Sequence, residues 1–591
     1  TRKNDDNFTP AGPLAHSWAS FLMGIPAGMS VATNDSYAML NPFFAWYAQD
    51  NWRISRKLSL NLGLRMEYEL GPNERYDRMI GWFDPSAQLP IAGGAQAAYA
   101  RTPIPELPAS QFVIQGGNTY PNVNGASRRI WRNELMWLPR AAFAYEVDSK
   151  TVIRGGYGLF YDTLNVLNEG PDQTGFSRAT STIISNDFGV NWLVGNPGAG
   201  VPPIADPFPV RANGTRFDEP LRSSLGAMSR AGRGWTFSDF NLRHARQQRW
   251  RIGIQRQLAT NIMVDVAYSG SYSDRVPLSR TLSPLPEQFW STGDRRNDQI
   301  LSSMNANVTN PFRITNFADL RASDPVLYQD MSTLGFFTSP TIRRNQLLRA
   351  FPHMNGLNND MTNVGKVRSH GVETVLQKRF AQGFMMNFGY TYLRTREADF
   401  FWNEFDTAPT YRESNDARPH RITGTGIYEL PFGRGRKWLQ RGALNHVAGG
   451  WQIAATYEFQ PGPLLNWGNL FYQGNLDNIG SADQILSLWF NTDGFVRPAN
   501  AQPGAYHVRV FPTRLDGIRA DFLNQWNANL QRDVRFTERI ALQLRFEAIN
   551  VSNRTQFAGP DVNPTSTNFG IVTSQTNTRN RFIQIQGRIR F

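Results

Sequence analysis

The sequence contains no cysteine and no long apolar run. Without cysteine the chain forms no disulfide, which suits a reducing compartment or an envelope protein that does not use disulfides. The most apolar stretch, residues 18–29 (WASFLMGIPAGM), is interrupted by Gly24 and Pro26. It is shorter than the roughly 20 apolar residues of a membrane-spanning helix. Together with a mean hydropathy of -0.44, this excludes a helical membrane protein.

Lysine is scarce as well, and arginine supplies most of the basic residues. The 61 Lys and Arg outnumber the 48 Asp and Glu and give a formal net charge of +13, but lysine occurs only at positions 3, 57, 150, 366, 378 and 437. The arginines are scattered along the chain, whereas nucleic-acid-binding proteins gather their basic residues into a patch or run. We therefore expect no nucleic-acid partner.

Interdomain linkers are also missing. A soluble chain of 591 residues would form roughly three or four domains, and no linkers stand out between them. Aromatic residues, in contrast, are abundant: 16 Trp, 19 Tyr and 39 Phe make up 13% of the chain. Membrane β-barrels use such residues as girdles at both membrane interfaces.

Several segments alternate between apolar and polar residues, as a strand with one apolar face does. Examples are RKLSLNLGLRMEYEL (56–70), GWQIAATYEFQ (450–460) and ERIALQLRFEAIN (538–550). A tilted strand of about eleven residues crosses a hydrocarbon band of about 25 Å. We therefore predict an all-β fold, an antiparallel transmembrane β-barrel. Its roughly 14 strands are expected near 15–23, 43–53, 57–70, 139–148, 151–162, 246–258, 261–272, 366–380, 383–395, 418–431, 448–461, 525–536, 538–552 and 580–591.

The same alternation predicts which side chains face lipid and which face the lumen. We expect Leu60, Leu62, Leu64, Leu542, Leu544 and Ile585 to face lipid. The lumen should receive Asn61, Arg65, Gln543, Arg545 and Arg588. On the last strands, the polar residues Arg545, Glu547, Arg588 and Arg590 either form ion pairs in a solvated wall or contact a domain inside the barrel.

Short and long connections alternate between the predicted strands. Tight turns are expected at 54–56, 149–150, 259–261, 381–383 and 537–538, and long, apparently structureless connections at 71–138, 163–245, 273–365, 396–417, 462–524 and 553–579. The segment 433–447 is an exception, since it is long where a short turn is due. In outer-membrane barrels the short turns are periplasmic and the long loops extracellular. We predict the same orientation here.

The C-terminal segment NRFIQIQGRIRF (580–591) alternates up to its last residue. Its terminal Phe591, with Ile589 and Ile585 on the same face, resembles the signal by which outer-membrane proteins are recognised for insertion. An aromatic residue at the periplasmic rim also suits the membrane interface.

No residues indicate catalysis. The seven histidines have neither metal-ligand spacing nor an HExxH motif, and no Ser/His/Asp arrangement is recognisable, so we expect no enzyme, no cofactor and no metal site. The GGYG segment (155–158) lies in a predicted strand with Tyr157 facing outward and is not a phosphate loop. We expect exposed aromatic residues in the outer loops to line a ligand site or, alternatively, to pack one loop on another; they are Trp467, Phe471, Tyr472 and Trp489.

Specific segments resemble the TonB-dependent outer-membrane receptors, in particular the large Oar-like group with an N-terminal carboxypeptidase-regulatory-like domain. They are NPFFAWYAQDNWRISRKLSLNLGLRMEYE (41–69), FLMGIP (21–26), GVETVLQKRFAQGFMMNFGYTY (371–392), NDARPHRITGTGIYELPFGRGRKW (415–438), GGWQIAATYEFQPGPLL (449–465) and LQLRFEAINVSNRTQF (542–557). The resemblance implies a 22-strand barrel, an internal plug and a segment that engages TonB.

The chain departs from that group because it has about fourteen predicted strands and nothing that resembles a plug. Residues 1–591 therefore resemble the C-terminal part of such a barrel. The resemblance implies import of a small nutrient bound at the extracellular loops, with a plug and the TonB complex as partners through the missing regions. Outer-membrane lipid and lipopolysaccharide would surround the barrel in a Gram-negative bacterium. The alternatives are a surface structural or adhesive barrel and a passive channel.

Overall fold

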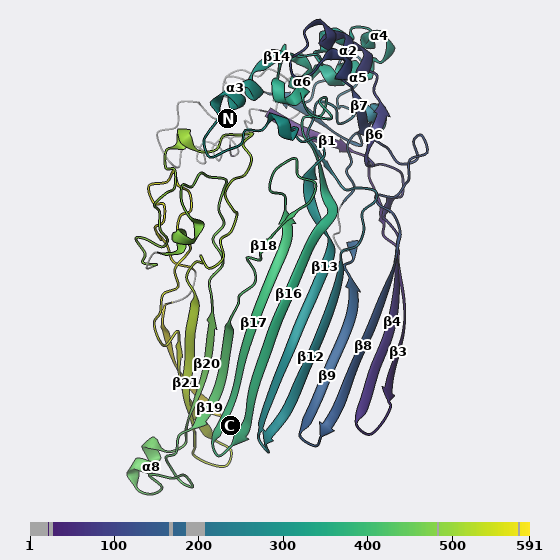
Figure 1. Ribbon diagram of the computed structural model, residues 1–591. Coiled ribbons are helices and arrows are strands. Elements are labelled where there is room, and N and C mark those ends of the chain that lie inside the picture. The colour runs from purple at the N-terminus through teal and green to yellow at the C-terminus, as the bar shows by residue number, and fades with distance from the viewer. Residues whose placement is uncertain (1–21, 23–27, 165–169, 185–206, 482–483, 577–579) are drawn as a thin grey trace.

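The computed structural model describes residues 22, 28–164, 170–184, 207–481, 484–576 and 580–591. Its main feature is a tall, curved antiparallel sheet with a cap of loops and short helices at one end (Figure 1). We call the thirteen consecutive strands of this sheet the wall. They are β3 (Phe43–Arg53), β4 (Leu58–Glu69), β8 (Glu134–Asp148), β9 (Thr151–Tyr161), β12 (Arg246–Ala259), β13 (Ile262–Thr281), β16 (Leu357–Ala381), β17 (Phe384–Phe400), β19 (Arg421–Glu429), β20 (Trp451–Gln460), β21 (Leu523–Arg535), β22 (Ala541–Ile549) and β23 (Phe582–Arg590).

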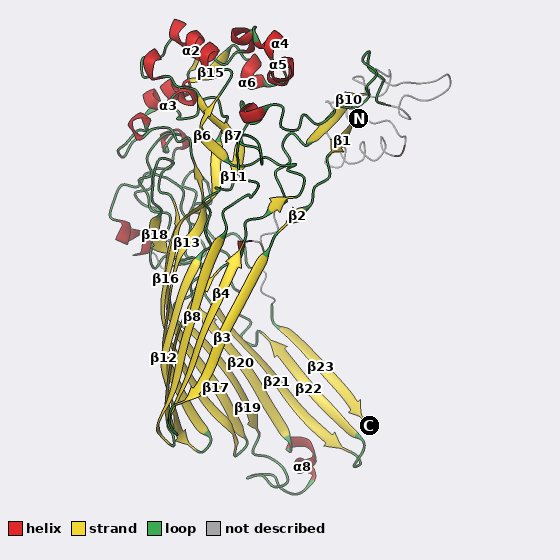
Figure 2. Cartoon of the chain, turned by 90° about the vertical axis from the view of Figure 1, so that its right-hand side faces the viewer, coloured by secondary structure: helices red, strands yellow, loops and turns green. Residues whose placement is uncertain are grey.

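Thirteen of the fourteen predicted strands are present, and the remaining one, 15–23, lies outside the described residues apart from Leu22. The strands pair in chain order, so the antiparallel all-β prediction is confirmed. Figure 2 shows the curvature of the wall. Within the described residues β3 and β23 are its two edges, and the sheet is not closed. No helix among these residues is both long and apolar enough to cross a membrane.

The strand register separates two faces. Leu62 pairs with Ala141, Ala141 with Tyr157, and Tyr157 with Trp250, which places one apolar row on what we call the outer face. The neighbouring row, from Asn61 across to Arg251, lies on the opposite, inner face. Because directly paired residues share a face, the two predicted sets fall on opposite sides of the sheet. The outer face carries Leu60, Leu62, Leu64, Leu542, Leu544 and Ile585, and the inner face carries Asn61, Arg65, Gln543, Arg545 and Arg588.

Tight turns join the strands at the end of the wall opposite the cap (Figure 1). In the turn between β16 and β17, Gln382 and Gly383 both have positive φ angles, of 56° and 77°. This matches a two-residue type I′ hairpin, whose twist fits the flanking strands. The predicted exception at 433–447 is confirmed. The connection between β19 and β20 is long and contains the helix α8 (Ala443–Ala448) at the turn end of the wall.

Four wall strands extend several residues beyond their predicted bounds. β8 has 15 residues, β13 has 20, β16 has 25 and β17 has 17. At roughly 3.4 Å per residue and a tilt near 40°, β16 rises about 65 Å, far more than a hydrocarbon band of about 25 Å. The extensions join the cap, where β11 (Trp235–Phe237) pairs with β16, and β18 (Thr410–Glu413) pairs with β17. They were missed because a strand outside the membrane needs no continuous apolar face.

The long connections are not structureless, as the sequence had suggested. They contain the paired strands β1 (Gly28–Asn34) and β10 (Ser177–Ile183), β2 (Met39–Leu40) and β5 (Asn73–Glu74), β6 (Phe83–Gln88) and β7 (Gln115–Asn118), and β14 (Asn307–Thr309) and β15 (Thr341–Arg343). Their helices are α2 (Ala92–Arg101), α3 (Asp298–Asn305), α4 (Leu320–Ser323), α5 (Pro325–Ser332), α6 (Gly335–Thr338) and α7 (Arg344–Leu347). Short 3-10 turns occur at Ala109–Gln111, Gly226–Met228, Glu287–Phe289, Ile314–Phe317, Leu476–Ser481 and Ala499–Ala501.

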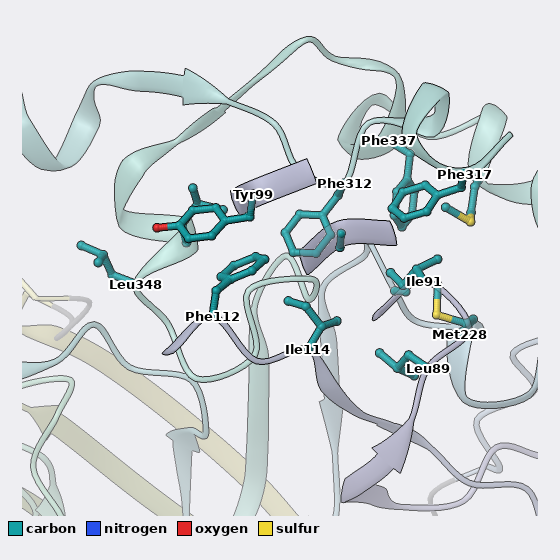
Figure 3. Packing of buried hydrophobic residues seen from close by; sticks show 14 of the residues in the cluster. Leu89, Ile91, Tyr99, Phe112, Ile114, Met228, Phe312, Phe317, Phe337 and Leu348 are labelled. Atoms are coloured by element: carbon teal, nitrogen blue, oxygen red, sulfur yellow. The ribbon is translucent and has the colours of Figure 1, made fainter. Parts of the chain in front are cut away.

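The cap has its own hydrophobic core (Figure 3). Tyr99 of α2 stacks on Phe112 with ring centroids 4.1 Å apart, and its hydroxyl donates to the carbonyl of Leu107 at 2.6 Å. Phe312 and Phe337 join the same cluster from a connection about 200 residues further along the chain. Burial of each large apolar side chain contributes about 1.5–3 kcal/mol, which orders long connections that lack regular strand patterns.

Candidate substrate path along the inner wall

The inner face of β8, β9, β12 and β13 has two rows of mainly small residues with arginines among them. In one row, Ala142 pairs with Gly156, Gly156 with Arg251, and Arg251 with Ser269. The next row toward the cap runs Arg140, Gly158, Arg249, Ser271 and Ser369. Small side chains leave the backbone open to the lumen, so these rows form a hollow.

This hollow is a cavity of about 630 Å³. Phe160 lies at its side, with its ring 4.7 Å from the Arg140 guanidinium carbon and 5.7 Å from that of Arg249. A Cβ at Gly158 would come within 2.8 Å of the Phe160 ring. Glycine at this position therefore lets the ring lie against the wall beside both cations, a cation–π arrangement.

The cavity carries an excess of positive charge. Arg251 lies 3.4 Å from both Asp265 and Glu373. Arg140 and Arg249, in contrast, have no carboxylate partner among the residues that the structure describes. Guanidinium groups bind carboxylate and phosphate in a bidentate geometry, and an aromatic ring adds a surface for flat groups. The hollow is therefore suited to an anionic ligand with a planar part.

A buried charge network lies where the cap meets the wall. His244, just before β12, contacts Glu69 at the end of β4 through Nε2 (3.1 Å) and Glu134 at the start of β8 through Nδ1 (2.9 Å). Arg275 of β13 contacts the same Glu134 at 3.2 Å. Burial alone would lower the pKa of His244, but the hydrogen bonds and negative charges of the two glutamates raise it to about 9. Through Glu134, the network also joins β13 to the ends of β4 and β8 and to the residues that precede β12.

The loop aromatics named from the sequence are mostly buried instead of exposed. Trp467 is 3% exposed, Phe471 2% and Trp489 6%, while Tyr472 is partly buried. The ring of Trp467 stacks on Phe495 at 5.6 Å, and the indole N–H of Trp489 donates to the carbonyl of Arg519 at 2.8 Å. The expected exposure was wrong, because long loops gain stability by packing these rings together. Their role in ligand binding remains a prediction.

The C-terminal residues named from the sequence are placed by the register of the last three strands. Arg545, Glu547, Arg588 and Arg590 lie on the inner face. Arg545 pairs with Glu547 on its own strand, and Arg590 reaches Asp533 at 2.6 Å across β22. Whether these groups also contact a domain inside the barrel remains a prediction.

The final aromatic residue and the apolar residues near it belong to the opposite face. Ile585 and Ile589 are exposed on the outer face of β23, and Phe591 is fully exposed. Their role as an insertion signal stays a prediction.

The residues of the cavity were not among those predicted from the sequence, although one signal was available. β9 has glycines two residues apart at 156 and 158, in the GGYG segment (155–158), and its neighbour β12 has arginines two residues apart at 249 and 251.

Among the described residues, no group of three or more His, Asp or Glu side chains could hold a metal ion.

The sequence matches one protein family, and several solved structures are similar to the fold. The family model described as outer membrane β-barrel domain matches residues 2–584. Similar solved structures include the unliganded ferric citrate transporter FecA, with a TM-score of 0.37 and 10% identity over 93% of this chain and 45% of that chain. Others are the outer membrane transporter YddB from Escherichia coli (0.35, 9%, 94% and 54%) and the copper transporter OprC (0.35, 8%, 93% and 48%).

The chain spans about half the length of each of these solved structures. No protein with a curated description matches it by sequence. The assignment therefore depends on the family model, which covers nearly the whole sequence. The chain belongs to the outer membrane β-barrel domain family, and it is a protein of the Gram-negative outer membrane.

Proposed function

We propose that this chain is the barrel part of a TonB-dependent receptor that binds a small nutrient on the extracellular side and passes it into the periplasm. The observation that carries the proposal is the arginine-lined cavity on the inner wall. A protein that uses its barrel only as an anchor needs no such hollow. A transporter needs polar groups along its path that bind the substrate transiently.

The directions of the edge strands support further strands in the complete barrel. Twelve antiparallel pairings connect β3 to β23, so the two edges point the same way. Direct closure would make them a parallel pair, whereas bacterial barrels have an even number of antiparallel strands. We propose that an odd number of additional strands closes the barrel. The predicted strand at 15–23 would be one of them, and the others would come from outside residues 1–591.

We further propose that the receptor consists of the parts that the sequence resemblance implies. Residues 1–591 form the C-terminal part of the barrel, while a plug, a regulatory-like domain and a TonB-contact segment belong to regions outside this chain. The nutrient would first contact the extracellular loops, where Tyr472 is the most accessible of the four predicted aromatic residues. It would then meet Arg140, Arg249 and Phe160 on the wall. An anionic nutrient, or one complexed with an anionic carrier, fits these residues best.

Uptake by cells that express the full-length receptor tests this function. We expect growth on a limiting anionic nutrient to require both the receptor and TonB. Replacing Arg140 and Arg249 by alanine should lower uptake at least tenfold, since a hydrogen bond to a charged group is worth about 1.5–3 kcal/mol. The matched control is Arg295→Ala, which removes an exposed arginine of the cap.

The alternative functions give different outcomes in the same assay. Uptake that continues without TonB, with steady conductance of the receptor in planar bilayers, would indicate a passive channel. Surface attachment that is lost with the receptor, while uptake is unchanged, would indicate an adhesive barrel. Either result would contradict the proposed transporter.

A further inference from the structure

A group of basic side chains lies on the outer face of the wall, near the cap end of β16 and β17. Arg368 and Arg396 are directly paired across the two strands, and so are His370 and Arg394. They share a face with Val372 and Tyr392, the next outward pair toward the turns. The side chains of Arg394 and Arg396 are 56% and 53% exposed. We call Arg368, His370, Arg394 and Arg396, together with Tyr411 of β18, the outer basic cluster.

The cluster surrounds a recess of about 250 Å³, and all five of its residues line this recess. A water molecule occupies about 30 Å³ in the liquid, so the recess has room for roughly eight waters or for one phosphate group. The guanidinium of Arg368 lies 5.4 Å from the ring centroids of both Tyr272 and Tyr411. Of these two rings, that of Tyr411 lines the recess.

Positive charge is in excess in the outer basic cluster. Glu413 accepts hydrogen bonds from Arg394 at 2.8 and 3.0 Å and lies 3.6 Å from Arg396. Asp516 is the only other carboxylate near these arginines among the described residues, 4.0 Å from Arg394. Arg368 has no carboxylate partner within the same part of the chain. Three guanidinium groups thus lie near only two carboxylates. Each guanidinium has five N–H donors, and most of these donors are not bonded to a carboxylate.

The height of the cluster places it at a membrane interface. Phe384, the first residue of β17, faces outward and pairs with Ala381 of β16, and Arg394 follows ten residues later. At roughly 3.4 Å per residue and a tilt near 40°, this is a rise of about 26 Å, which matches the full height of about 25 Å of the apolar band of a barrel. Phe388, Tyr390 and Tyr392 lie outward between them. The arginines are therefore directly above an apolar and aromatic surface.

A neighbouring charge pair on the same face shows that the excess is local. Arg246 and Asp274 are directly opposed on β12 and β13 and form a bidentate ion pair at 3.0 and 2.6 Å. The positive charge of Arg246 is therefore balanced by the carboxylate of Asp274. The outer basic cluster, by contrast, holds like charges close together, and an anionic partner would relieve their repulsion.

We propose that the outer basic cluster binds the phosphate group of lipid A, the phosphorylated glycolipid of the outer leaflet. The recess receives the phosphate, and the surface formed by Phe388, Tyr392 and Val372 contacts the acyl chains below it. A free phosphate ion would use only the first of these two surfaces. The proposal depends on the predicted orientation, with the cap outside the cell, and does not require nutrient transport.

Lipid binding to the purified full-length receptor tests the proposal. The receptor is placed in neutral phosphatidylcholine nanodiscs and titrated with bisphosphorylated lipid A, with dephosphorylated lipid A, and with inorganic phosphate. A basic residue near an anionic membrane surface contributes about fivefold in affinity. We therefore expect the variant with Arg368→Gln, Arg394→Gln and Arg396→Gln to bind bisphosphorylated lipid A about a hundredfold more weakly. Dephosphorylated lipid A should bind the unmodified receptor about as weakly.

The matched control removes three arginines from the opposite face of the same sheet, by Arg140→Gln, Arg249→Gln and Arg251→Gln, and should leave lipid A binding unchanged. Heat-modifiable gel mobility confirms that each variant is folded. If the outer triple variant does not fold, Arg368→Gln alone, which breaks no ion pair, should still weaken binding about fivefold. Equal losses in the two triple variants, no loss in the outer one, or inorganic phosphate binding as tightly as lipid A would each overturn the proposal.

Discussion

The charge of His244 should stabilise the junction between cap and wall in a pH-dependent way. The imidazole of His244 is 1% exposed and lies between Glu69 and Glu134. The backbone N–H of His244 also donates to Glu134, at 2.9 Å. Its pKa of about 9 in the folded protein exceeds the ordinary value of 6.5. Because the folded state holds this proton more tightly, the stabilisation is fully present below pH 6.5 and is lost as the pH rises through 9.

The magnitude follows from the two pKa values. A difference of one pKa unit corresponds to about 1.36 kcal/mol, so the change from 6.5 to about 9 is worth about 3 kcal/mol of unfolding free energy. Replacing the imidazolium by a neutral amide, His244→Gln, should remove about this amount at pH 6. At pH 10, where His244 is neutral in the folded state as well, the same substitution should cost much less.

Urea unfolding of the receptor from lipid vesicles, followed by tryptophan fluorescence at pH 6, 8 and 10, measures both effects. His446→Gln is the control, because His446 lies exposed on α8 at the opposite end of the wall. The unmodified protein should lose about 3 kcal/mol between pH 6 and 10 relative to His244→Gln. If both proteins lose the same stability over this range, His244 is not the titrating group and the reasoning fails.

Three further predictions concern the faces and the orientation of the wall. Replacing Ile585 by arginine should lower the unfolding free energy by about 2–4 kcal/mol if this outward position is near the bilayer midplane, whereas arginine at Gln586 should lower it little. Urea unfolding measures both changes, and equal losses would contradict the assignment of the outer face to lipid. Cysteine at Asn61 should react with a membrane-impermeant reagent and cysteine at Leu62 should not, and the reverse pattern would mean that the faces are exchanged. An epitope inserted at the exposed Asn213 should bind antibody on intact cells; binding only after lysis would show that the cap is periplasmic.

The membrane-spanning part of the fold was predictable because one physical constraint governs it. A strand with lipid on one side and water on the other must alternate, and residues 56–70 do so without interruption. The predicted strand 43–53 therefore has the same bounds as β3, and 57–70 differs from β4 by one residue at each end. Residues 357–365 of β16 show no such alternation, because this part of the strand packs into the cap, where Leu357 and Asn359 are buried. The predicted strand therefore began only at 366.

The cap and the cavity could not be predicted in the same way. The core around Tyr99 and Phe312 joins segments about 200 residues apart, and no local pattern indicates which apolar loop residues will meet. The cavity depends on the register of several strands, because Gly158 and Arg249 become neighbours only when β9 and β12 pair as they do. The aromatic residues at 467, 471 and 489 show the converse error, since composition suggested exposure and packing buried them.

Two short segments show how much the register decides. Arg249-Trp250-Arg251 and Arg394-Thr395-Arg396 have the same spacing of arginines, and sequence alone assigns them the same character. In the wall, the first segment turns its tryptophan outward and both arginines into the cavity, while the second turns both arginines outward and its threonine inward. A shift of one residue in either strand would exchange these roles. The proposed substrate path and the proposed lipid A site are thus made from the same residue type, and the pairing of the strands determines which of the two each arginine serves.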